Sequence, residues 1–217
     1  MGSFRRLVLL LLLAFGQPLH AEQLRLALYG QRDEISLRSD SAEIDTRVSL
    51  LGLTINGIYT PHLEASLDLG RSWLTQSGSP ATQGMELSGQ FVGVAVRVWP
   101  LRGSHLDAWV QGDYGVYSFS GSSSGQKTDI DWYDGGLSAG LVAHLGMVDL
   151  HAGARHGSLS GDEIASGAMS YTRSIRLEDK NSVWVGMELH VDQSGSIGVW
   201  FENGSHRGVS LRFAHRY

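Results

Sequence analysis

The chain has 217 residues and a formal net charge of −5, with 17 Lys and Arg residues against 22 Asp and Glu residues. This balance disfavours nucleic acid as a partner, because phosphate binding needs clustered Lys and Arg. The absence of cysteine excludes a disulfide framework and any thiolate metal ligand or nucleophile, and the 28 glycines favour many short strands over a helical bundle.

The amino terminus has the layout of a secretory signal peptide. Arg5 and Arg6 precede an apolar run over Leu7–Phe15, and the small residue Ala21 stands where a cleavage site would end. The run is shorter than the roughly 20 residues that a membrane-spanning helix needs. We therefore expect residues 1–21 to be a signal peptide rather than an anchor, and residues 22–217 to form one exported domain.

From residue 23 onward, apolar and polar side chains alternate in segments near ten residues long. The segment Leu137–Leu145 is an example, with Leu, Ala and Leu at its odd positions. Recurrent alternation of this kind is the signature of a transmembrane β-barrel. Ten strands are expected, near residues 23–37, 43–59, 62–75, 84–99, 105–119, 128–144, 147–158, 167–178, 182–192 and 206–217. Residues 197–201 also alternate, so eight or twelve strands stay open.

The alternation alone does not separate a membrane barrel from a soluble sandwich or lipocalin-like barrel turned inside out. Turn lengths favour the membrane barrel: short turns at residues 60–62, 100–104, 145–147 and 178–181 contrast with longer polar loops at 76–84, 120–128 and 158–167. Aromatic residues near the expected strand ends are typical of an interfacial girdle. The candidates are Tyr59, Trp73, Trp99 and Tyr133.

The apolar positions change phase at two places within the expected strands. The changes occur near Leu50-Leu51 and near Phe91-Val92. Either a β-bulge or a change in the surroundings of the strand would account for them.

The face opposite the apolar one carries acids and arginines. Opposite charges in a narrow interior favour pairing, because an unpaired buried charge is costly. The expected lumen network consists of Glu64, Asp68, Arg97, Asp107, Asp113, Asp134, Asp149, Arg155, Arg176, Glu188, Arg212 and Arg216. Such a network predicts a largely plugged barrel, with a narrow pathway for ions or small solutes as the alternative. Arg173 falls on the expected lipid face.

One catalytic arrangement is present in outline. His156 and Ser158 share the expected lipid-facing register, and Glu163 follows closely. A histidine bonded to a serine and oriented by an acid is a nucleophilic arrangement. The His-x-Ser spacing resembles that of the outer-membrane lipid A deacylases, although Leu159 stands where that family has Asn. A lipid A-modifying hydrolase is therefore an alternative function. We expect the barrel not to be an enzyme.

No cofactor or metal site is expected from the nine histidines. His144 and His151 flank a predicted hairpin but lack a third ligand at convincing spacing. We expect both to form hydrogen bonds in the lumen.

The carboxy-terminal strand is the most specific feature. Apolar residues fall at Val209, Leu211 and Phe213, and the aromatic Tyr217 is the last residue given. This pattern resembles the closing strand of small Gram-negative outer-membrane β-barrel proteins, in the OmpX- and OmpW-like general class. The resemblance implies an antiparallel transmembrane up-and-down β-barrel, recognition of these four residues by the barrel-assembly machinery, and contact with outer-membrane lipid and lipopolysaccharide.

Localisation in the cell outer membrane follows from the same resemblance. The expected function is a structural or interaction role in the cell envelope.

Overall fold

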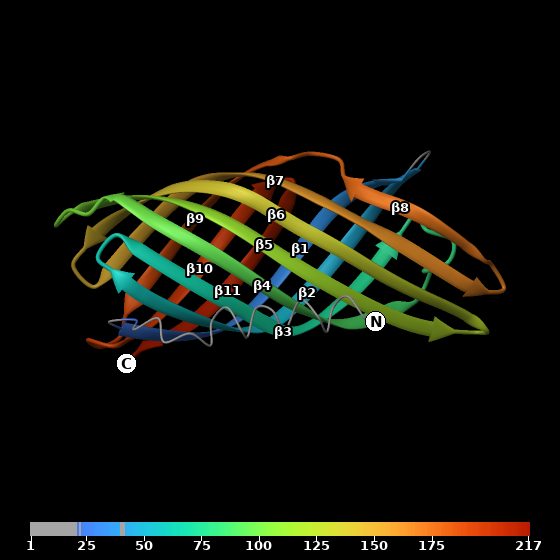
Figure 1. Ribbon diagram of the computed structural model, residues 1–217, viewed down its shortest axis with the longest axis horizontal. Coiled ribbons are helices and arrows are strands. Elements are labelled where there is room, and N and C mark those ends of the chain that lie inside the picture. Colours follow the sequence, from blue (N-terminus) through green and yellow to red (C-terminus); the bar gives the residue numbers. More distant parts are fainter. Residues whose placement is uncertain (1–20, 22, 40–41) are drawn as a thin grey trace.

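The computed structural model describes residue 21, residues 23–39 and residues 42–217. The signal peptide expected over residues 1–21 lies, apart from Ala21, outside the described residues. Within them, no helix is long and apolar enough to cross a membrane. The described chain consists of strands β1 (Gln23–Ser39), β2 (Ala42–Thr60), β3 (Leu63–Ser77), β4 (Glu86–Leu101), β5 (Leu106–Ser123), β6 (Gln126–Leu145), β7 (Val148–Gly167), β8 (Tyr171–Leu177), β9 (Asn181–His190), β10 (Gly195–Gly204) and β11 (His206–Arg216) (Figure 1).

The strands form one closed antiparallel ring. Each strand from β1 to β7 pairs with its successor, and β11 returns to pair with β1 from Arg25↔Arg216 to Ile35↔His206. Strand β1 begins and β11 ends at the same end of the ring, which we call the termini end; the opposite end is the far end (Figure 1). The expected up-and-down β-barrel is confirmed, and so is its size of about ten strands.

Strands β8 and β9 follow one path along β7. Strand β8 pairs with the far part of β7 and β9 with the part near the termini end, with a break at residues 178–180 between them. The turn expected at 178–181 is therefore wrong, since the chain continues in the same direction. Strand β10, which was expected only as an extra element, restores the count to ten.

The short hairpin β10–β11 lies between β9 and β1 and ends at Gly204-Ser205. Beyond it, β8 pairs directly with β1 through Leu37↔Leu177 and Arg38↔Arg176. The ring thus contains ten strands near the termini end and eight at the far end.

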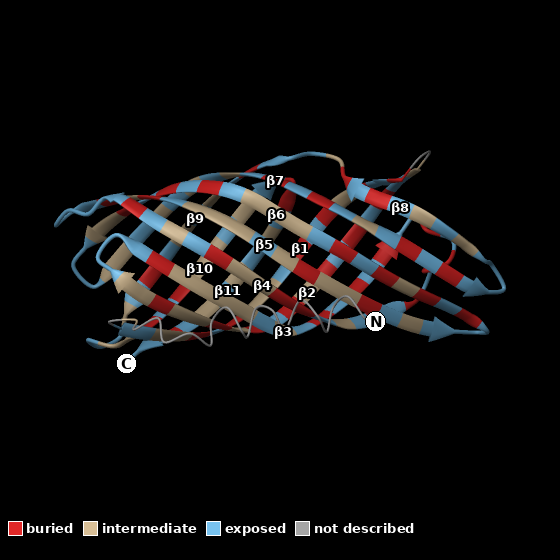
Figure 2. Ribbon diagram, viewed as in Figure 1, coloured by how far each residue is buried: buried red, intermediate tan, exposed pale blue. Residues whose placement is uncertain are grey.

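The inward and outward faces exchange character along the barrel. On β4 the outward residues change from Ser88 and Gln90 to Val92, Val94 and Val96, whereas the inward residues change from apolar to polar. Buried and exposed residues alternate along much of the barrel wall, most clearly in the far half (Figure 2). The outward face is apolar toward the termini end and polar toward the far end.

The phase changes at Leu50-Leu51 and Phe91-Val92 lie at this exchange. Leu50 packs inside the barrel, whereas Leu51 is 51 % exposed on the outside. The pairings Leu51↔Arg71 and Val92↔Leu69 continue without a register shift. The phase changes are therefore not bulges, and the change of surroundings explains them.

The far half of the interior contains an apolar core. Its centre is aromatic, with ring centroids of Phe119 and Trp132 4.8 Å apart and those of Phe91 and Tyr117 5.5 Å apart. The buried members of this far-end core are Tyr29, Ile35, Leu37, Ile44, Val48, Leu50, Leu74, Met85, Leu87, Phe91, Phe119, Ile130, Trp132, Leu159, Ile175 and Leu177. The far half therefore resembles a soluble β-barrel in its side-chain pattern.

The loop between β3 and β4 closes over this core. Ser79, Ala81, Thr82 and Met85 of the loop are buried. The Thr128 hydroxyl of β6 donates to the Ala81 carbonyl at 3.1 Å, which ties the loop to the barrel wall.

Candidate functional site

A polar chamber of about 470 Å³ lies inside the barrel below the far-end core. It reaches the termini end, since Arg102, His190 and Arg216 at the ends of their strands line it. Ten of the expected lumen residues line this chamber: Glu64, Arg97, Asp107, Asp113, Asp134, Asp149, Arg155, Glu188, Arg212 and Arg216. Asp68 lines an adjoining cavity of about 140 Å³ and accepts a hydrogen bond from Thr54.

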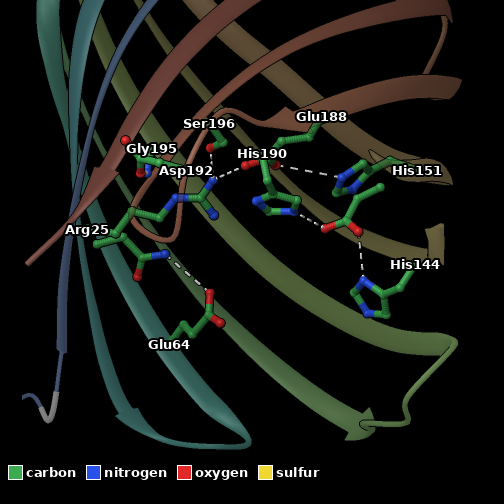
Figure 3. A network of polar contacts seen from close by, with 11 residues as sticks. Arg25, Glu64, His144, His151, Glu188, His190, Asp192, Gly195 and Ser196 are labelled. Carbon is green, nitrogen blue, oxygen red and sulfur yellow. Dashed lines mark hydrogen bonds and ion pairs between the residues drawn. The ribbon is translucent and has the colours of Figure 1, made fainter. Parts of the chain in front are cut away.

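A chain of histidines and aspartates runs along one wall of the chamber near the termini end. His144 of β6 contacts Asp107 through Nε2 at 3.2 Å and Asp149 through Nδ1 at 2.8 Å. The second oxygen of Asp149 contacts Nε2 of His190 at 2.8 Å (Figure 3). Strands β5, β6, β7 and β9 are joined by this chain, and no group of three or more His, Asp or Glu side chains suited to a metal ion occurs among the described residues.

Arg25 joins β1 to the nearby strands β9 and β10. Its guanidinium donates to Glu188 of β9, and to the Ser196 hydroxyl of β10 at 3.0 Å. His151 lies on the other side of Glu188, with its Nε2 3.7 Å from the carboxylate (Figure 3). His151 and His144 thus contact different acids rather than each other.

Glu64 of β3 is the centre of a second group. One carboxylate oxygen accepts from Trp99 Nε1 and from Arg102 Nη2, each at 2.8 Å, and the other accepts from Asn56 at 3.2 Å. Trp99, expected as an interface aromatic, is therefore inside the barrel and only 7 % exposed. The expectation was wrong because Trp99 shares the inward register of Arg97, and its indole N–H is paired by a buried acid.

Arg155 of β7 forms the deepest ion pairs of the chamber. Its guanidinium contacts Asp113 at 2.8 Å and Asp134 at 3.0 Å. Both acids lie on the two preceding strands, so the three charges brace consecutive strands from inside.

The β9–β10 turn holds further polar contacts. At the β9–β10 turn, an Asp192 oxygen accepts from the backbone N–H groups of Ser194 at 2.7 Å and Gly195 at 2.6 Å. These hydrogen bonds hold the pKa of Asp192 below its ordinary value, because they favour the ionised carboxylate.

The predicted positions of two arginines on β8 are corrected. Arg176 is exposed on the outer surface and is not part of the lumen network. Arg173 turns inward, where it pairs with the fully buried Glu163 at 2.7 Å. The reason is that β8 lies in the far half, where the apolar residues Ile175 and Leu177 face inward instead of outward.

The expected catalytic residues do not assemble. His156 and Ser158 are both exposed on the outward face of β7, and His156 Nδ1 lies 2.8 Å from the Asn181 amide oxygen. Glu163 faces inward, where it accepts hydrogen bonds from Tyr171 and Ser79. The acid and the serine therefore lie on opposite faces of one strand.

The outward face carries the residues expected as interface aromatics and as an assembly signal. Trp73 and Tyr133 are exposed, Tyr133 stacks on Tyr114 with ring centroids 6.3 Å apart, and Tyr59 is half-buried near the end of β2. Val209, Leu211, Phe213 and Tyr217 are between 42 % and 69 % exposed, at the end where β11 closes the ring. Their recognition during assembly stays a prediction.

Several chamber residues were missed in the sequence. Trp109 and Trp184 stack with centroids 5.6 Å apart, Arg97 lies on Trp109, and Arg25 and Arg102 pair with acids. The alternation contained the signal for Trp109, which shares the inward register of Asp107, and for Trp184, which shares that of Glu188. Arg25 is paired with the expected lumen residue Arg216, whereas Arg102 follows the end of β4 and could not be placed by alternation.

Comparison with known proteins gives the same architecture. No protein-family model and no curated protein sequence matches this chain. The outer membrane protease OmpT of Escherichia coli is similar in structure, with 8 % identity, 91 % of this chain and 95 % of that chain covered, and a TM-score of 0.52. The translocator domain of the autotransporter NalP of Neisseria meningitidis has 13 % identity, 100 % and 96 % coverage, and a TM-score of 0.50. At these identities the likeness concerns the fold. The chain therefore has the fold of outer-membrane β-barrel proteins.

Proposed function

We propose that this outer-membrane β-barrel is closed to diffusion and serves a structural or interaction role in the envelope. The main support for this proposal is the far-end core, which fills the far half of the barrel with buried apolar side chains from β1 to β8. The β3–β4 loop covers that core from outside. A pathway through the barrel would have to cross both.

The orientation follows from the general architecture of bacterial barrels, in which short turns face the periplasm. The termini end then faces the periplasm, and the outward apolar band around it lies in lipid. The far half, with its polar outward face, extends beyond the lipid and offers the surface for an interaction. We infer that lipopolysaccharide surrounds the band and that the barrel-assembly machinery recognises β11.

The narrow channel is the weaker alternative. It is supported by the polar chamber, whose charged and polar lining suits water and ions. However, the chamber ends at Trp132 and Leu159 of the far-end core. The lipid A-modifying hydrolase is weaker still, because Glu163 is committed to Arg173 inside the barrel and is turned away from Ser158.

Conductance in planar lipid bilayers tests the closed barrel. We expect the purified protein to give no discrete current steps under conditions in which a general porin conducts. The Phe119→Ala/Trp132→Ala variant removes the closest ring pair of the core, which is 4.8 Å between centroids, and is expected to conduct if it folds. Stable current steps from the wild-type protein would contradict the proposal, and a boiled-versus-unboiled gel shift establishes that each sample is folded.

A further inference from the structure

Arg97 and Arg212, inside the barrel, have no acidic partner among the residues that the structure describes. Among the described residues, no carboxylate oxygen lies within 4.0 Å of the guanidinium nitrogens of Arg97 or Arg212. Arg25, Arg102 and Arg155 around them each have one. A charge taken from bulk water without a partner is unfavourable, so the exception at Arg97 and Arg212 needs an explanation.

Aromatic rings hold both guanidinium groups. The Arg97 Cζ atom lies 4.3 Å from the Trp109 ring centroid and 5.5 Å from that of Trp99. Arg212 lies 5.4 Å from the Trp200 centroid and 5.8 Å from that of Tyr29. Cation–π contacts orient a guanidinium and attract it, but they leave its net charge and its in-plane N–H donors available.

Few of these donors are used within the described part of the chain. Arg97 donates through Nε to the Gln111 amide oxygen at 3.0 Å, which leaves both of its Nη atoms without a protein acceptor there. Arg212 donates to no described side chain. A planar fork of free N–H groups matches the oxygens of an oxyanion.

The two arginines share one cavity. Together with Arg25 they line the space of about 140 Å³ that adjoins the chamber. Three acids also line it: Glu64 is paired with Arg102, and Asp113 is paired with Arg155. Only Asp68, bonded to the Thr54 hydroxyl, lacks a basic partner within 4.0 Å among the described residues. The three arginines and three acids that line the cavity balance in formal charge, so the cavity offers an anion the free N–H donors of Arg97 and Arg212 rather than a net positive charge.

We propose that this cavity is a binding site for a phosphate-type oxyanion, held between Arg97 and Arg212. Neutral polar side chains complete the cavity wall: the amide groups of Asn56 and Gln111 supply further N–H donors, and the Thr54 hydroxyl donates to Asp68. The chamber shares Arg25, Arg97 and Arg212 with the cavity and extends to Arg216 at the termini end. The ligand enters from the periplasmic side, and the closed far half plays no part in binding.

Titration of the folded protein in detergent tests the site. Inorganic phosphate is the first probe. Its binding is measured by isothermal titration calorimetry and by broadening of its phosphorus NMR line. The test variant is Arg97→Gln/Arg212→Gln, and Arg212→Gln alone replaces it if the double variant gives no heat-modifiable band. The matched control is Arg176→Gln, because Arg176 is exposed on the outer surface.

We expect the wild-type protein and the control to bind phosphate saturably. The affinity of the test variant should be weaker by about tenfold or more, because charge-assisted hydrogen bonds are lost. Absence of saturable binding by the wild-type protein, or equal affinity in the test variant, overturns the proposal. A soluble sugar phosphate separates the sources of the ligand. Equal affinity for it assigns the site to the phosphate group of a larger molecule, and binding of inorganic phosphate alone assigns it to the free ion.

Discussion

Glu163 of the far half needs hydrogen-bond partners for its carboxylate, because its side chain is fully buried. It accepts hydrogen bonds from Arg173 at 2.7 Å, Tyr171 at 2.6 Å and Ser79 at 2.9 Å. Its acceptors are therefore satisfied by β8 and by the β3–β4 loop. This one carboxylate ties the loop over the far-end core to the barrel wall.

Removing the partner of Glu163 is expected to destabilise the far half. Arg173→Met leaves an uncompensated buried carboxylate and should lower the free energy of unfolding by about 3–5 kcal/mol. Addition of Glu163→Gln should recover much of that loss, because the buried charge is then removed as well. Urea unfolding of the detergent-folded protein, followed by tryptophan fluorescence, measures both changes.

Arg176→Met is the matched control for that substitution. Arg176 lies on the same strand as Arg173 but on the exposed side, and an exposed substitution is expected to stay within about 0.5 kcal/mol. Equal destabilisation by the two Met variants would show that Arg173 does not have the inward position described above.

At the scale of elements, β4 combines the two environments of the barrel in one strand. Val96, in the apolar band, and Ser88, in the polar far half, are both outward and exposed. Val96→Arg should destabilise the folded barrel by about 2–4 kcal/mol if its position is near the middle of the bilayer. Ser88→Arg should cost within about 0.5 kcal/mol. Urea unfolding in lipid vesicles measures the difference, and equal costs would contradict a band limited to the termini half.

The sequence was sufficient to place strands β1 to β7 and β11 and most inward-facing charges, because alternation with a period of two assigns each residue to a face. The exceptions lie on β8, where Arg176 and Arg173 were assigned to the wrong faces. A pattern of apolar and polar residues does not reveal which face points to lipid. The exchange at the far half reverses that assignment, so the same alternation there has the opposite meaning.

The path of β8 and β9 could not be predicted from the sequence for a different reason. Residues 178–180 have the composition of a turn, yet they interrupt a single strand. Whether a polar break reverses the chain depends on the partner strand, here β7, which pairs with both β8 and β9. The partners of the chamber acids were likewise not assigned, because contacts between non-adjacent strands, such as Arg25 with Glu188, join residues far apart in sequence.

At the scale of the whole molecule, the barrel changes its number of strands along its axis. The hairpin β10–β11 adds two strands beside the polar chamber and stops below the far-end core. Eight strands enclose only enough space for side chains to fill. The narrowing to eight strands thus matches the place where the interior becomes filled and apolar, and the ten-stranded part matches the place where a cavity remains.

Closure of the narrow part depends on the contact between β1 and β8, and a designed disulfide tests it. Arg38 and Arg176 are directly paired, and opposite residues of an antiparallel pair have Cα atoms about 4.5–5.5 Å apart, within the range that a disulfide bridges. Because the chain contains no cysteine, Arg38→Cys/Arg176→Cys should form one intramolecular bond upon oxidation in outer membranes, visible as a mobility difference between reduced and non-reduced gels. Arg32→Cys/Arg176→Cys is the control, since Arg32 lies six residues along β1, roughly 20 Å away. A bond in both variants, or in neither, would refute direct closure by β8 and leave the far half without an explanation for its filled core.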